Sequence, residues 1–198
     1  MKVLILPVVC CILFSSVAIG DEPFNGKDLS GWRVDGKTKD TKDHWKVVDG
    51  LIYGENANKK GSNLWTTAEY KDFELEVEYK TSTKDYDTGV FARATSHQVQ
   101  IGISRSLKKD MTGCIYAPKD KQGSYPGQTD KVAKFHKVGK WNKLRVVVQG
   151  KNIKTFLNGE AFVDYQCKTI PEKGPIGLQL HGGVHMIVEF KNLKLKKL

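Results

Sequence analysis

The sequence predicts an all-β domain built as a sandwich of two antiparallel sheets, with little helix. Residues 72–80 alternate acidic and apolar side chains over a full strand length, as a half-buried antiparallel strand does. Asp49-Gly50 and Asn158-Gly159 each separate two short apolar runs, and both pairs favour the positive φ angles of tight hairpin turns. No segment repeats apolar residues at the i, i+3, i+4 and i+7 spacing over three turns, so helix should be minor.

The remaining strands are expected wherever short apolar or alternating runs end in turn residues. In chain order the expected strands are 45–48, 51–53, 72–80, 89–93, 97–103, 144–149, 154–157, 160–163, 176–181 and 187–195. This many short strands is typical of an antiparallel sandwich or jelly roll. The one long irregular stretch runs from about Pro118 to Lys140, and it is either a functional loop or a solvated surface excursion.

The first twenty residues have the pattern of a secretory signal. Lys2 precedes the apolar run Val3 to Phe14, and the small residues Ala18 and Gly20 mark a cleavage site. The run is short for a membrane-spanning helix and Pro7 interrupts it, which disfavours an uncleaved anchor. We therefore expect a signal peptide at 1–20, a single domain at 21–198, and a secreted or periplasmic protein.

The net charge of the chain limits the kinds of partner that are expected. There are 32 Lys and Arg against 22 Asp and Glu, a formal net charge of +10, which favours anionic partners. Export disfavours nucleic acid, so the expected partner is a carbohydrate, anionic glycans included, with no membrane contact after signal cleavage.

Loss of the leader would leave two cysteines, Cys114 and Cys167, which could form a disulfide or remain as two buried thiols.

Three expected strands carry apolar residues on one face and an unusual polar set on the other. Side chains alternate along a strand, so residues two apart share a face. Amides, arginine and aromatic rings suit the hydroxyls and apolar faces of sugars better than a solvated Lys/Glu face would. The alternative is that the amides only satisfy the edges of strands. The residues of this polar face are Phe91 and Arg93, Gln98 and Gln100, and Gln179 and His181.

Several chemistries have no support in the sequence. It contains no GxGxxG, phosphate-binding loop, HExxH, CxxC or GxSxG pattern. His181 and His185 flank Gly182-Gly183, which indicates a turn rather than a metal-binding helix face, so we expect no metal and no cofactor. A two-acid glycosidase is disfavoured, because Gln98 and Gln100 stand where acids would be needed.

Nine segments in the same order resemble the 3-keto-disaccharide hydrolase domain family, formerly a domain of unknown function. The resemblance implies a concanavalin A-like jelly roll, related to family-16 glycoside hydrolases, in an exported bacterial protein that acts on carbohydrate. The segments are 24–32, 70–75, 89–93, 99–101, 112–116, 139–142, 157–159, 174–182 and 190–193.

The chain departs from the family pattern at two positions. The family usually has Glu where Gln98 stands, and it commonly has Asp just after that strand, where this chain reads Gly102-Ile103-Ser104. If those acids hold a metal or transfer protons, this chain could bind sugar without cleaving it.

The resemblance implies cleavage of a 3-keto-glycoside. A ketone at C3 acidifies the proton on C2, so one base can remove it and expel the aglycone from C1. We expect His181 as the base and Arg93 as the group that stabilises the enolate. The alternative for His181 is a structural histidine that positions the Gly182-Gly183 turn.

Five residues are expected to contact the sugar. The three glutamines of the set should share one concave face with His181 and Arg93, with Tyr116 and the Pro118–Lys140 loop at its rim. The expected sugar-binding residues are Gln98, Gln100, Gln179, Tyr116 and Trp65. Two other readings stay open: a non-catalytic carbohydrate-binding (laminin G-like) module, and a protein-adhesion domain, which would need a large exposed apolar patch.

Overall fold

The computed structural model describes residues 22–35, 39–120 and 123–198. Within these ranges the chain forms thirteen strands, two 3₁₀ segments, η1 (Lys39–His44) and η2 (Pro118–Asp120), and one short helix, α1 (Val132–Phe135). The predicted all-β class is confirmed. The expected signal peptide at 1–20 lies outside the described residues. No helix in the described part is long and apolar enough to cross a bilayer.

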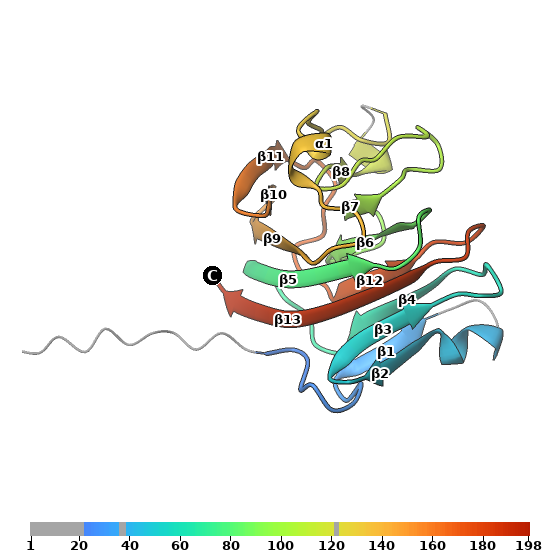
Figure 1. Cartoon of the computed structure of the whole chain (residues 1–198). Coiled ribbons are helices and arrows are strands. Elements are labelled where there is room, and N and C mark those ends of the chain that lie inside the picture. The colour runs from blue at the N-terminus through green and yellow to red at the C-terminus, as the bar shows by residue number, and fades with distance from the viewer. Residues whose placement is uncertain (1–21, 36–38, 121–122) are drawn as a thin grey trace, which may run out of the picture.

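The strands form two antiparallel sheets, which pack face to face (Figure 1). The six-stranded sheet has, in spatial order, β1 (Trp32–Asp35), β4 (Ser62–Thr66), β12 (Ile176–Leu180), β6 (Asp87–Ala92), β7 (Gln98–Gly102) and β8 (Ile115–Tyr116). The seven-stranded sheet has β11 (Glu160–Gln166), β10 (Asn152–Leu157), β9 (Asn142–Gln149), β5 (Phe73–Thr81), β13 (Ile187–Lys197), β3 (Leu51–Glu55) and β2 (Trp45–Val48).

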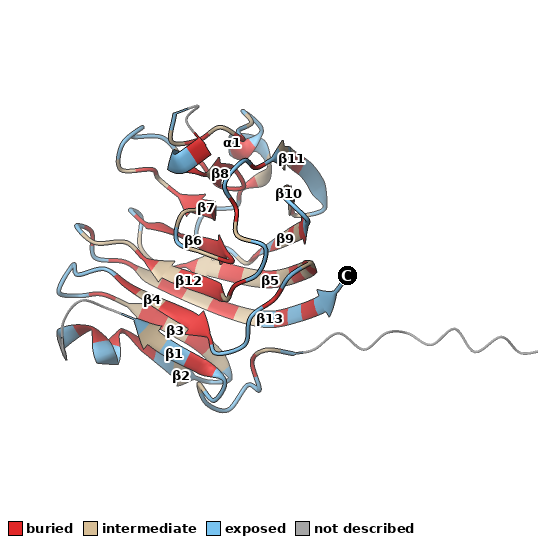
Figure 2. Ribbon diagram, turned by 180° about the vertical axis from the view of Figure 1, so that it is seen from behind, coloured by how far each residue is buried: buried red, intermediate tan, exposed pale blue. Residues whose placement is uncertain are grey.

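Alternation along the strands builds the core between the sheets. Along β5 the burial alternates residue by residue, with Leu75 and Val77 fully buried and Glu76 between them partly exposed. Figure 2 shows the same banding along β5 and β13. From the other sheet, Val99, Ile101 and Leu178 fill the core. Burial of this apolar surface is the main stabilising contribution to the sandwich.

The hairpin predicted at Asn158-Gly159 is present. It joins β10 to β11, and both turn residues have positive φ, 52° and 93°. Asn and Gly adopt this conformation at low cost, which is why the pair specifies the turn.

The topology brings distant segments together in the six-stranded sheet. β12 pairs with β4 on one side and with β6 on the other, and β6 pairs with β7. The three strands that carry the polar face in the sequence, β6, β7 and β12, are therefore neighbours. Their core-facing residues point toward the seven-stranded sheet, so Phe91, Gln98, Gln100 and Gln179 lie on the outer face.

Cys114 and Cys167 are both free and buried. Of the two possibilities left open by the sequence, the structure has the two buried thiols.

Candidate active site on the outer face of the six-stranded sheet

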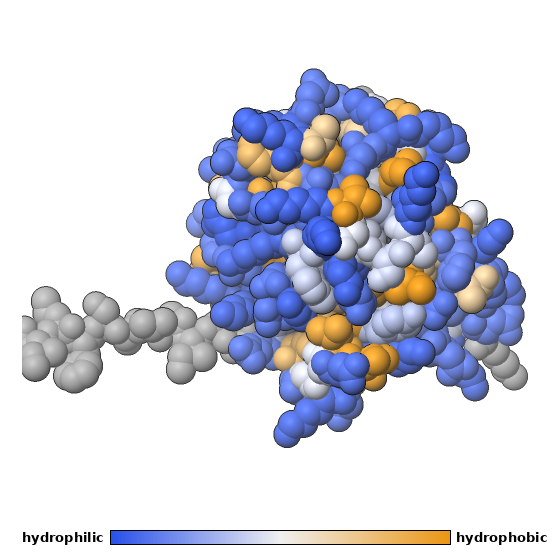
Figure 3. Space-filling model, in the orientation of Figure 1, coloured by the Kyte–Doolittle hydropathy of each residue, from blue (hydrophilic) through white to orange (hydrophobic). Residues whose placement is uncertain are grey.

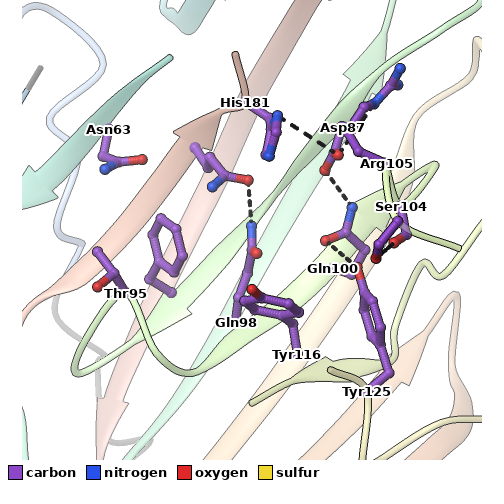
Figure 4. A pocket seen from close by; sticks show the side chains of 13 residues that line it. Asn63, Asp87, Thr95, Gln98, Gln100, Ser104, Arg105, Tyr116, Tyr125 and His181 are labelled. Carbon is purple, nitrogen blue, oxygen red and sulfur yellow. Dashed lines mark hydrogen bonds and ion pairs between the residues drawn. The ribbon is translucent and has the colours of Figure 1, made fainter. Parts of the chain in front are cut away.

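A cavity of about 320 Å³ opens on the outer face of β6, β7 and β12 (Figure 4). We call it the narrow cavity. It brings together five of the seven residues predicted from the sequence: Gln98, Gln100, Gln179, Tyr116 and His181. The other residues that line it are Asn63, Asp87, Phe91, Thr95, Ser104, Arg105, Ser106 and Tyr125.

A hydrogen bond between two amides crosses the floor of the narrow cavity. Nε2 of Gln98 on β7 donates to Oε1 of Gln179 on β12 at 2.8 Å. β6 lies between these strands, and its Gly89 leaves room for the bond: a Cβ built there would lie 2.4 Å from Nε2 of Gln98. The bond orients the Gln179 amide so that its own Nε2 faces away from Gln98 and stays available to a ligand.

A third amide, that of Gln100, is held by a carboxylate. Nε2 of Gln100 donates to Oδ1 of Asp87 at 2.7 Å, and the hydroxyl of Tyr125 donates to Oε1 of Gln100 at 3.2 Å. Burial raises the pKa of Tyr125 well above its ordinary value, so the phenol stays a donor at physiological pH. The other carboxylate oxygen of Asp87 lies 3.4 Å from Nε of Arg105.

His181 stands beside this carboxylate with one ring nitrogen engaged and one available. Its Nδ1 lies 2.6 Å from the carbonyl oxygen of Gly182, and because a carbonyl only accepts, Nδ1 carries the proton. In the neutral ring Nε2 is then the unprotonated nitrogen, and it has no partner among the described residues. Oδ2 of Asp87 lies 4.0 Å from Nδ1, close enough to stabilise a positive charge on the ring.

Further polar groups at the cavity are free to meet a ligand. Within the described part of the chain, the side-chain amide of Asn63 and the hydroxyls of Thr95 and Tyr116 have no hydrogen-bond partner, and Figure 4 shows all three at the cavity wall. Phe91 and Tyr116 add aromatic surface beside them. Unpaired amides and hydroxyls next to aromatic rings suit a polyhydroxylated ligand with apolar ring faces.

The prediction that Arg93 shares this face is corrected by the structure. β6 ends at Ala92, and Arg93 has a left-handed φ of 65°, so the alternation that would place it beside Phe91 stops one residue earlier. Its buried guanidinium donates instead to the carbonyls of Lys71, Gly150 and Pro171 and to Asp72. Arg93 thus holds together the segments that carry these acceptors, and it does not line the narrow cavity.

Trp65, predicted to bind sugar, also lies outside the narrow cavity. It is on the outer face of β4, and its ring stacks on Phe91 with 5.1 Å between centroids. Both rings are 3% exposed, but only Phe91 lines the cavity. Gly177, between them on β12, leaves the space for this contact. Trp65 therefore supports Phe91 from behind rather than offering its own face to a ligand.

The sequence reasoning missed Asp87, Arg105, Tyr125, Asn63 and Thr95. Asp87 could have been found, because it has the same strand parity as Gly89 and Phe91. Tyr125 comes from the Pro118–Lys140 loop, and its buried ring packs on Tyr116, which also lines the cavity. Among the described residues of the loop, Tyr125 alone lines the narrow cavity.

One buried cluster has the residue types of a metal site, but its carboxylate is already engaged in hydrogen bonds that hold two segments of the chain together. His97, Asp120 and Cys167 place their potential ligand atoms within 4.8 Å of one another, and all three are buried. Asp120, however, already accepts bonds from Tyr165, from the backbone N–H groups of Lys168 and Thr169, and from the Thr169 hydroxyl. These donors satisfy the carboxylate, so the cluster anchors η2 to the segment after β11.

A wider cavity of about 750 Å³ adjoins the narrow one. We call it the wide cavity. The two share Asn63, Thr95, Gln179 and His181, so they lie side by side, and we call the two together the groove. The wide cavity is completed by Asp35, Thr41, Lys60, Gly61, Ser62, Leu180 and Gly182.

A family model described as the 3-keto-α-glucoside-1,2-lyase-like domain matches residues 21–196. The chain belongs to this family. A 3-keto-disaccharide hydrolase of Bacteroides thetaiotaomicron is 36% identical over 74 residues, which cover 34% of this chain and 25% of that protein. The match thus spans a quarter of the length of that relative.

Solved structures carry the same fold. A protein of Parabacteroides distasonis, named for a glycosyl hydrolase, superposes with a TM-score of 0.65 and 22% identity over 89% of this chain and 92% of its own. The carbohydrate-binding module CBM66 of Bacillus subtilis superposes with a TM-score of 0.54 and 14% identity over 84% of this chain and 96% of its own. At these identities the likeness concerns the fold alone. These structures confirm the jelly-roll sandwich, and family membership makes the chain a carbohydrate-active protein.

Proposed function

We propose that the protein is an exported enzyme that cleaves 3-keto-glycosides, with His181 as its general base. The observation that carries the proposal is the state of the His181 ring. Nδ1 donates to the Gly182 carbonyl and Nε2 is unengaged, in a cavity that also holds a carboxylate and a set of unpaired amides and hydroxyls. Family membership supports the same chemistry.

The reaction needs one base and one group that stabilises an oxyanion. Nε2 of His181 takes the proton from C2, and the electrons of that bond delocalise onto the ketone oxygen at C3 as an enolate. Collapse of the enolate restores the ketone, forms a C1–C2 double bond and breaks the bond from C1 to the aglycone oxygen. The protonated imidazole returns its proton to that oxygen, and addition of water to the unsaturated sugar would make the overall reaction a hydrolysis.

Two amides replace Arg93 as candidates to stabilise the enolate. Gln179 has its Nε2 directed away from the Gln98 bond, and the Asn63 amide has no partner among the described residues. Oriented N–H donors of this kind stabilise developing negative charge without reorganising during the reaction. Asp87, 4.0 Å from Nδ1, would stabilise the imidazolium that forms at the same time.

The second candidate is a carbohydrate-binding module without turnover. Gln98 and Ser104 stand where the family has acids, which favours the binding module, as does the superposition on a carbohydrate-binding module.

The proposal of a protein-adhesion domain has less support. Large apolar residues exposed in the described part are few and scattered, at Val48, Leu107, Val138 and Leu198, and the face in Figure 3 is largely hydrophilic.

The test is to incubate the purified chain with 3-keto-glycosides and with the same glycosides lacking the ketone, each with and without EDTA. We expect release of the aglycone from the keto compounds alone, and no effect of EDTA, since a histidine base needs no metal. Binding of glycans without any release would overturn the enzyme in favour of the binding module. Export is tested separately, by sequencing the amino terminus of secreted or periplasmic material: Asp21 supports it and an intact Met1 contradicts it.

A further inference from the structure

Asn56 lies in the loop between β3 and β4, directly after Glu55 ends β3, and its side chain is fully buried. The described hydrogen bonds of this side chain all go to backbone groups. Nδ2 donates to the carbonyl oxygens of Lys60 at 3.1 Å and His181 at 3.0 Å, and Oδ1 accepts from the N–H of Met186 at 2.9 Å. One buried amide thus joins its own loop to two points that lie 125 and 130 residues further along the chain.

The two backbone groups that Asn56 holds flank the turn that contains Gly182 and Gly183. Glycine has no Cβ to restrict its φ and ψ angles, so two glycines in succession give this turn little stiffness of its own. The loop that carries Asn56 supplies the constraint. The N–H of Gly183 donates to the carbonyl of Lys59 at 2.8 Å, and a Cβ on Gly182 would lie only 3.2 Å from the backbone nitrogen of Gly61. The loop therefore lies directly against the turn.

The peptide group that Asn56 contacts is the one next to the proposed base. The backbone N–H of His181 donates to the carbonyl of Asp87 at 3.2 Å, and its C=O accepts from Asn56, so both backbone groups of His181 are engaged. The Asn56 bond fixes the plane of the peptide between His181 and Gly182, which limits where the next carbonyl, that of Gly182, can point. That carbonyl accepts from Nδ1 of His181 at 2.6 Å, which leaves Nε2 unprotonated in the neutral ring.

We propose that Asn56 is a positioning residue, which holds the His181 ring in the orientation and tautomer that a base requires. The inference rests on the proposed function and adds to it a residue that lines neither cavity. The hydrogen bond made by one ring nitrogen of a histidine sets which nitrogen carries the proton, and packing and hydrogen bonds behind a site hold its reacting groups in place. Here this influence passes through two peptide groups rather than through direct contact with the ring.

Two substitutions of Asn56 separate the bonds that it makes. Asn56→Asp keeps the size of the side chain and the acceptor for Met186 but replaces the NH₂ that donates to His181 by an oxygen, whereas Asn56→Ala removes every side-chain bond. Asn142→Ala is the matched control. Asn142 is also buried, and its side chain likewise donates to two backbone carbonyls and accepts from a backbone N–H, but it lies on β9 in the other sheet and lines neither cavity.

The first measurement is the ¹⁵N NMR spectrum of the His181 ring at about pH 8, where an imidazole is neutral, assigned by comparison with His181→Ala. We expect the wild type to show the Nδ1–H tautomer, and both Asn56 variants to show a mixture of the two tautomers. Asn142→Ala should keep the wild-type spectrum. A wild type with similar amounts of both tautomers, or Asn56 variants with the wild-type spectrum, overturns the inference.

The second measurement is kcat and KM for a 3-keto-glycoside. We expect both Asn56 variants to lower kcat by about tenfold or more and to change KM by less than about twofold, because the groups that meet the sugar are untouched. Asn142→Ala should keep both constants, although its thermal midpoint of unfolding should fall about as far as that of Asn56→Ala.

Two outcomes of the kinetic measurement would assign Asn56 to stability alone and overturn the inference. These are equal losses of kcat in Asn56→Ala and Asn142→Ala, and Asn56 variants that fail to fold beside a folded Asn142→Ala. A wild type that cleaves no 3-keto-glycoside overturns the proposed function instead. The ring spectrum needs no substrate, so it still decides in that case whether Asn56 positions His181.

Discussion

Gln98 donates to Gln179 at 2.8 Å across a strand that contributes only a glycine at the point of crossing. The two amides belong to β7 and β12, which are separated by β6 in the sheet. The bond fixes which end of the Gln179 amide faces a ligand, so the arrangement of donors in the narrow cavity depends on the empty space above Gly89.

Substitution of Gly89 by alanine should therefore damage both the fold and the site. The added Cβ would lie 2.4 Å from Nε2 of Gln98 and 2.5 Å from the backbone oxygen of Val99, and the backbone cannot move aside cheaply. We expect Gly89→Ala to lower the free energy of unfolding by about 1–3 kcal/mol and to weaken sugar binding. Denaturant unfolding and a binding titration measure the two effects. Unchanged affinity in a folded Gly89→Ala protein would show that the amide pair does not orient the ligand.

Asp87 is the carboxylate that the sequence reasoning overlooked. Its Oδ1 accepts from Gln100 and its Oδ2 faces the ring of His181 at 4.0 Å. Asp87→Asn keeps the shape but removes the charge that stabilises the imidazolium, so kcat should fall by about 10- to 100-fold, which corresponds to about 1.4–2.7 kcal/mol. Asp85→Asn is the matched control, because Asp85 also binds Arg105 but lies outside the cavity. Equal rates for the two variants would remove Asp87 from the mechanism.

The fold was readable from the sequence because its signals are local. Alternation along 72–80 and the Asn158-Gly159 pair depend only on neighbouring residues, and the structure has a strand and a turn there. The shared face of Gln98 and Gln100 follows from strand parity in the same way.

Some residues of the site could not be placed from the sequence, because their positions do not follow from the alternation of side chains along a strand. Arg93 does not lie on the polar face, because the strand ends before it and its φ is positive. Strand alternation predicts a residue's face only while the strand continues, so it could not show this. Trp65 is buried by Phe91, which comes from a strand two places away in the sheet, across β12. Tyr125 reaches the cavity from a loop, and a loop has no period from which its direction could be inferred.

The hydrogen bonds to the Asp120 carboxylate should make the free energy of unfolding fall at acid pH. Burial raises the pKa of Asp120, but hydrogen bonds from Thr169, Lys168 and Tyr165 outweigh it, and the net pKa is lowered. A lowered carboxyl pKa stabilises the fold above the ordinary value of 3.8, and this stabilisation is lost as the pH falls through the lower folded-state pKa. Asp120→Asn should therefore be about 3 kcal/mol less stable than wild type at pH 7, with a gap that narrows below about pH 4.

Denaturant unfolding from pH 7 to pH 3 measures this gap, with the exposed Asp130→Asn as the control that should show none. A gap that stays constant across the range would contradict the part assigned to the Asp120 carboxylate.

The two buried thiols should not react with thiol reagents in the native protein. Burial raises the pKa of Cys114, and that of Cys167 to about 12, so neither forms the reactive thiolate at neutral pH. A thiol reagent should label neither cysteine in the folded chain and both after denaturation without reductant. Denatured protein that still fails to react would instead indicate a Cys114–Cys167 disulfide.

The most direct test of the central claim is the rate of 3-keto-glycoside cleavage by His181→Ala, measured beside His185→Ala. Both histidines are about equally exposed, 43% and 42%, but only His181 lines the groove, while His185 lies 3.1 Å from Glu55. General-base catalysis contributes about 10²- to 10⁴-fold, so His181→Ala should lose activity by that factor, with sugar affinity and the thermal midpoint of unfolding nearly unchanged. His185→Ala should keep the wild-type rate. Full activity in a folded His181→Ala protein would contradict the account.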